Sequence, residues 1–91
     1  AKIHAMDLMT WDTAQMKAEG KRHSTEAAML KLLGSKWCCE ICDECIQVLG
    51  GNGYSREFHV ERLYRDAKLL EIGEGTSEIQ RVVISGAVLA K

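Results

Sequence analysis

Residues 24–49 have the sequence STEAAMLKLLGSKWCCEICDECIQVL, the longest stretch of the chain with a helical pattern of side chains. Small and apolar residues recur there at alternating steps of four and three positions. Such spacing lies along one side of a helix that packs nearly antiparallel to its neighbours. The residues of this seam are Ala28, Leu32, Ser35, Cys39, Cys42, Ile46 and Leu49. The stretch therefore predicts a helical bundle.

Three more helices are predicted around this one, at residues 1–19, 57–72 and 76–90. The last begins at Thr76 or Ser77, and Ser77 with Gln80 fits a capping box. The expected core positions of the third helix are Val60, Leu63, Tyr64, Ala67 and Leu70. Those of the last helix are Ile79, Val82, Val83 and Gly86. With short connections and no strand signal, the fold class is all-α, an antiparallel helical bundle.

Composition narrows the classes of function. The 91 residues are 46% hydrophobic and 27% charged, contain no proline, and allow one domain or a piece of one. A net charge of −1 gives no basic footprint for nucleic acid. No apolar run approaches the roughly 18 residues of a membrane span. The chain lacks an initiator Met and begins as if inside a helix, so we expect a fragment.

Four cysteines lie within eight residues, which argues for reduced thiols and an intracellular setting rather than a disulfide framework. Their spacing also resembles that of iron–sulfur sites. However, they follow the helical period, as small hydrophobic residues do, so no metal site is predicted and metal analysis is the test. They are Cys38, Cys39, Cys42 and Cys45.

The stretch 71–81 has the sequence EIGEGTSEIQR and places Glu74 between two glycines, just before hydroxyl residues that can begin a helix. Backbone N–H groups at a helix entrance lack intrahelical acceptors. A carboxylate there can act as a general base while the N–H groups stabilise developing negative charge. The alternative is a tight turn with a solvated acid. Similarly, residues 50–53 (GGNG) fit either a phosphate cradle or a plain turn, and Arg56 breaks the dinucleotide-binding pattern.

Taken together, residues 46–54 (IQVLGGNGY), 60–68 (VERLYRDAK) and 74–81 (EGTSEIQR) resemble the C-terminal helical domain of the acyl-CoA dehydrogenase family. Their order and separations match that domain along essentially the whole chain. Other short segments resemble the short-chain and general bacterial branch. Two positions differ. Gly73 stands where many members have an aromatic residue, which leaves more room beside the acyl chain, and His59 stands where the family often has proline.

The resemblance implies a flavoenzyme that desaturates an acyl-CoA thioester between its α and β carbons. Glu74 would take the α proton while the β hydrogen leaves as hydride to N5 of FAD, and Gly75 would contact the substrate. The backbone N–H of Glu74 would help to bind the thioester carbonyl. Thr76, Ser77 and Glu78 would contact FAD, and a neighbouring subunit's FAD would be reached by Gln47, Val48, Leu49, Gly50 and Gly51.

The resemblance also implies partners and a location. Electrons would pass from reduced FAD to an electron-transferring flavoprotein, and the full-length enzyme would be a homo-oligomer, expected to be a tetramer. Its location would be the bacterial cytoplasm, or the mitochondrial matrix in a eukaryote. Much of the site would lie in domains outside these residues. The alternative is therefore a catalytically incomplete bundle that acts only in self-association.

Overall fold

The computed structural model describes residues 1–90, and within them the chain forms helices and no strands. This confirms the predicted all-α fold class. The helices in chain order are α1 (Lys2–Ala18), α2 (Ser24–Leu49), α3 (Gly51–Tyr54), the 3-10 helix η1 (Arg56–Phe58), α4 (Val60–Ile72) and α5 (Ser77–Leu89).

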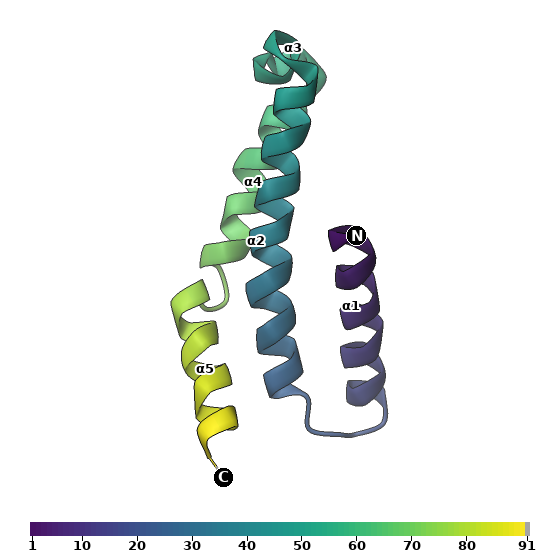
Figure 1. The fold of residues 1–91 in the computed structure, drawn as a ribbon, viewed down its shortest axis with the longest axis vertical. Helices are drawn as coiled ribbons and strands as arrows, with labels where there is room; N and C mark the ends of the chain where they lie inside the picture. The colour runs from purple at the N-terminus through teal and green to yellow at the C-terminus, as the bar shows by residue number, and fades with distance from the viewer. Residues whose placement is uncertain (91) are drawn as a thin grey trace.

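Helix α2 is the central element against which the other long helices pack (Figure 1). Helix α1 lies on one side of α2. On the other side the chain runs back in two pieces, with α4 beside the C-terminal half of α2 and α5 towards its N-terminal end. The turn between α4 and α5 therefore lies beside the first half of α2. Within residues 1–90, no helix is long and apolar enough to cross a membrane.

The connection from α2 to α4 differs from the prediction of one helix over residues 57–72. His59 has φ 61° and ψ −11°, a left-handed conformation that interrupts the helix, so α4 begins at Val60 and residues 56–58 form η1. Before it, Gly53 lies so close to α2 that a Cβ would be 2.4 Å from the carbonyl oxygen of Ile46. Only glycine fits there, and the short α3 folds back on the end of α2.

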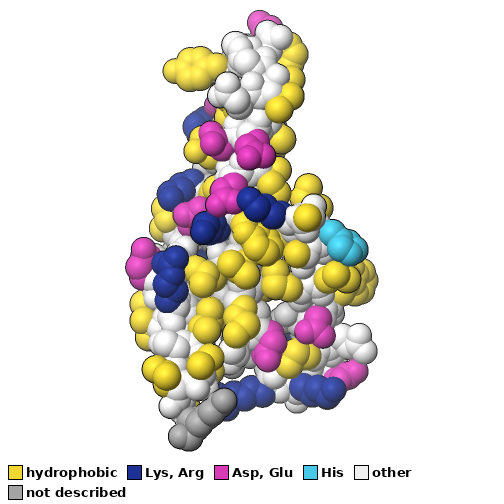
Figure 2. All heavy atoms as spheres, viewed as in Figure 1, with side chains coloured by type: hydrophobic (Ala, Val, Ile, Leu, Met, Phe, Trp, Pro, Cys, Tyr) yellow, Lys and Arg dark blue, Asp and Glu magenta, His cyan; other side chains and the backbone are white. Residues whose placement is uncertain are grey.

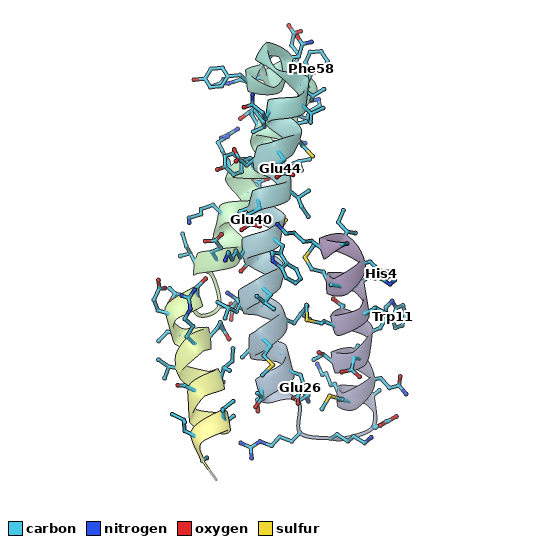
Figure 3. The ribbon with its side chains drawn as sticks, viewed as in Figure 1. His4, Trp11, Glu26, Glu40, Glu44 and Phe58 are labelled. Atoms are coloured by element: carbon cyan, nitrogen blue, oxygen red, sulfur yellow. The ribbon has the colours of Figure 1, made fainter. Side chains whose placement is uncertain are left out.

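The buried core is thin. Ala28 and Ser35 of α2 are buried, as the seam predicts, together with Ala67 of α4. Other expected core positions are exposed, including Leu63 at 54% and Val82 at 64%. Hydrophobic side chains are visible at the surface in Figure 2, and Figure 3 shows Trp11 pointing away from α2.

The shape explains this exposure. The radius of gyration is 15.6 Å, against about 12 Å for a compact domain of this length. The principal extents are 51 × 24 × 20 Å, because the other long helices flank α2 in an open layer rather than closing a bundle. A helix in such a layer buries only the face towards α2, so an apolar stripe wider than that face stays exposed.

Candidate active site

The residues between α4 and α5 form a tight turn with an unusual backbone. Gly73 is extended, with φ −70° and ψ 147°. Glu74 then has φ 57°, and Gly75 has φ 101°. The left-handed conformation costs a residue with a Cβ about 1–2 kcal/mol. Glu74 is therefore held in a strained conformation by its surroundings, and strain of this kind concentrates at functional sites.

Thr76 caps α5. Its Oγ1 accepts a hydrogen bond from the N–H of Ile79 at 3.3 Å. The capping box expected between Ser77 and Gln80 is wrong, because Ser77 is already the first helical residue. Gln80 is instead buried, at 9% exposure, and its amide Nε2 donates to the carbonyl oxygen of Gly75 at 3.4 Å. Glu78 lies in the first turn of α5, where a negative charge is favoured by the helix dipole.

Lys31 of α2 reaches across to the same turn, and sequence reasoning missed it. Its Nζ donates to the carbonyl oxygen of Gly75 at 2.6 Å and to that of Leu70, in the last turn of α4, at 2.9 Å. A usable signal was present. Lys31 lies three residues after buried Ala28 and four before buried Ser35, so it occupies the inner face of α2, where a cation requires acceptors.

Glu74 and Gly73 border an open groove of about 710 Å³ between α1, α2 and the end of α4. Its lining is mainly apolar. At its floor α1 approaches α2 closely, since a Cβ on Gly34 would lie 3.7 Å from the sulfur of Met6. The other residues that line the groove are Thr10, Leu30, Lys31, Ser35, Cys38, Leu69 and Leu70.

Thr76, Ser77 and Glu78 border a different hollow of about 350 Å³, which is charged. Three cations line it, from three helices: Lys36, Lys68 and Arg81. Two carboxylates, Glu71 and Glu78, also line it. Glu71 accepts from Lys68 at 3.0 Å, and its pKa is lowered by the neighbouring Cys39 thiol and then by Lys68. The turn thus presents its carboxylate to an apolar groove and its helix cap to a cationic hollow.

The segment from Gln47 to Gly51 is not brought to this turn. It includes Val48, which is 84% exposed, and Leu49, where α2 ends, followed by Gly50, which has φ 62°. Lys31, which contacts Gly75, precedes Gln47 by 16 residues of continuous helix, or about 24 Å. The two predicted cofactor-contacting segments therefore lie near opposite ends of α2 in one chain.

The cysteines lie along α2 as free thiols. Cys38, Cys39 and Cys42 are half-buried, and Cys45 is exposed. Burial, with a smaller effect of Glu71 beside it, raises the pKa of Cys39 to about 11. In the described part of the chain, no three Cys, His, Asp or Glu side chains gather as a metal site would require.

The fold and the turn together define an all-α domain in which Glu74, a carboxylate residue with a strained backbone, stands just before the entrance of a helix. Residues 1–89 match the family model described as "Acyl-CoA dehydrogenase, C-terminal domain". The chain belongs to the acyl-CoA dehydrogenase family, as its resemblance predicted, and corresponds to that domain.

Individual relatives agree with this assignment. Over 87 residues the chain is 50% identical to the mitochondrial short-chain specific acyl-CoA dehydrogenase of Rattus norvegicus, covering 96% of this chain and 21% of the relative. It is 42% identical over 90 residues to the CarC subunit of the caffeyl-CoA reductase–Etf complex of Acetobacterium woodii, covering 99% and 24%. The butyryl-CoA dehydrogenase structure from Megasphaera elsdenii superimposes with a TM-score of 0.94 at 40% identity, covering 97% and 23%. The chain thus spans under a quarter of the length of these relatives.

Proposed function

We propose that this chain supplies the catalytic base and part of the flavin site of an FAD-dependent acyl-CoA dehydrogenase. The observation that carries the proposal is the backbone of Glu74, a non-glycine residue at φ 57° that borders an apolar groove in a chain of this family. A solvated acid in an ordinary turn has no need of a strained backbone, whereas a base must be aimed at its substrate.

Glu74 removes the α proton of the bound acyl-CoA thioester. Within residues 1–90 its own backbone N–H donates to no other group of the chain, so it is available to the thioester carbonyl. A hydrogen bond there stabilises the negative charge that develops on the carbonyl oxygen as the proton leaves. Gly75 follows with φ 101°, where the missing side chain lets a substrate approach the main chain.

The cationic hollow beside Thr76, Ser77 and Glu78 fits an anionic cofactor such as FAD. Its three cations outnumber its two carboxylates, one of which, Glu71, is paired with Lys68, and the N-terminus of α5 offers unpaired N–H groups to a negative charge. Thr76, Ser77 and Glu78 would help to hold FAD there, and the flavin would supply the acceptor for the hydride from the β carbon. The chain's own contribution is to offer polar groups to the cofactor at the start of α5, next in sequence to Glu74.

A second subunit completes this site in the proposal. Gln47–Gly51 lie about 24 Å of helix away from the turn in the same chain. In the proposal, this separated segment contacts the FAD of a neighbouring subunit. The exposed apolar surface of the chain supports such an association of subunits. An electron-transferring flavoprotein as acceptor is supported by the relative named as a subunit of an Etf complex.

The test uses the holoenzyme that contains this chain. Butyryl-CoA or hexanoyl-CoA is added without an electron acceptor, and the flavin absorbance near 450 nm is followed. We expect rapid bleaching by at least one straight-chain acyl-CoA. A flavin that stays oxidised with all acyl-CoA chain lengths would reject the dehydrogenase proposal.

The alternative function, self-association alone, is favoured by the thin core for the isolated 91 residues. Titrating the purified chain with FAD separates the two. We expect little or no quenching of flavin fluorescence, because the site also needs elements outside these residues. Tight stoichiometric binding would show that the chain holds FAD unaided.

A further inference from the structure

The ammonium group of Lys31 joins the two ends of the turn that carries Glu74. It donates to the carbonyl oxygen of Leu70 at 2.9 Å and to that of Gly75 at 2.6 Å, reaching 39 and 44 residues along the chain. Leu70 lies in the last turn of α4, where carbonyl groups lack intrahelical donors. A single side chain from α2 thus satisfies one carbonyl before Glu74 and one directly after it.

These two hydrogen bonds explain how Glu74 keeps a left-handed backbone. The conformation is unfavourable for a residue with a Cβ, and Gly73 and Gly75 on either side are the most flexible residues available. Without an external tie, such a turn can relax by rotating its glycines, which would redirect the Glu74 side chain. Gln80 adds only a longer contact of 3.4 Å to Gly75, so Lys31 is the main tie.

We propose that Lys31 is a positioning residue for the base: it holds the turn at Leu70 and Gly75 so that Glu74 points at the substrate's α carbon. The inference rests on the proposed function of Glu74. Lys31 itself transfers no proton and acts through the backbone. Displacement of a base by about 1 Å costs up to roughly 100-fold in rate, which sets the size of the expected effect.

The first experiment compares flavin reduction in holoenzymes carrying Lys31→Met, Lys31→Arg or the control Lys17→Met, an exposed lysine on α1. We expect Lys31→Met to lower the rate at saturating acyl-CoA by about 10- to 100-fold with KM nearly unchanged. Lys31→Arg, which keeps several donors, restores most of that rate, and Lys17→Met matches the wild type. A wild-type rate in Lys31→Met, or an equal loss in Lys31→Arg, would overturn the proposal.

The second experiment does not depend on catalysis. Hydrogen–deuterium exchange is compared between the wild type and Lys31→Met, peptide by peptide. We expect faster exchange confined to peptides covering residues 70–80. Faster exchange throughout the chain would make Lys31 a general stability residue, and unchanged exchange at 70–80 would show that it does not hold the turn. If the wild-type flavin is never reduced by acyl-CoA, the proposed function fails while this measurement still decides the role of Lys31.

Discussion

Gly75 and Gln80 fit together so closely that a side chain at position 75 would displace the Gln80 amide. A Cβ on Gly75 would lie 2.7 Å from Nε2 of Gln80, the same atom that donates to the Gly75 carbonyl oxygen at 3.4 Å. Gln80 is buried, so it has little room to withdraw. Together with φ 101°, this contact makes the residue after the candidate base a glycine for two separate reasons.

Gly75→Ala should therefore destabilise the chain. We expect a loss of about 1–2 kcal/mol in the free energy of unfolding, from the left-handed backbone and the displaced Gln80. The matched control is Gly86→Ala in α5, where a Cβ meets no atom within 4 Å. That change should stabilise by about 0.5–1 kcal/mol, because alanine favours a helix. Urea unfolding of both variants checks the pair, and equal stabilities would contradict this account of the turn.

Cys39 should make stability fall in alkaline solution. Its folded pKa is about 11, against 9.0 for an unperturbed thiol, so between these values the unfolded chain loses a proton that the folded chain keeps. The folded state binds more protons there, and its stability decreases as pH rises above about 9. Thermal unfolding from pH 7 to 10.5 should show a steeper loss in the wild type than in Cys39→Ala. Equal slopes in the wild type and in Cys39→Ala would contradict this prediction.

The exposed apolar surface predicts self-association. The described residues expose 6805 Å², against about 5,300 Å² for a compact monomer of this mass. Sedimentation equilibrium should give a mass above 10.1 kDa that rises with concentration. Trp11→Glu, at a side chain that is 71% exposed, should lower that mass, whereas Lys17→Glu on the same helix should not. A monomer at all concentrations would refute this prediction.

The sequence predicted the parts of the fold that depend on local pattern. The seam of α2 marked Ala28 and Ser35 as inward-facing, and both are buried. The prediction of buried residues was wrong where burial depends on which helices pack against one another. Val82 has the right helical spacing for a core position, but the layer brings no helix over it. Likewise, Thr76 rather than Ser77 caps α5. Both residue types can cap a helix, so residue type alone does not decide at which of the two positions the helix begins.

The candidate site was predictable as a segment but not as a geometry. Residues 74–78 stand out through glycines, a carboxylate and hydroxyl residues, and the structure places them at the turn and the first residues of α5. The tie from Lys31 was missed because it joins positions 44 residues apart through backbone carbonyl groups. The sequence marks the donor, a lysine on the inner face of α2, but neither acceptor depends on the residue type at its position, so the pattern of side chains does not show which carbonyl groups Lys31 reaches.

The central claim is that Glu74 is the proton-abstracting base, and single-turnover flavin reduction in Glu74→Gln tests it most directly. The matched control is Glu57→Gln, which removes an exposed carboxylate from η1, away from the turn. Both holoenzymes should retain FAD. We predict that Glu74→Gln slows bleaching by butyryl-CoA or hexanoyl-CoA by at least roughly 100-fold, since an amide cannot accept the α proton, while Glu57→Gln reacts as the wild type does. Bleaching of Glu74→Gln at the wild-type rate would contradict the assignment.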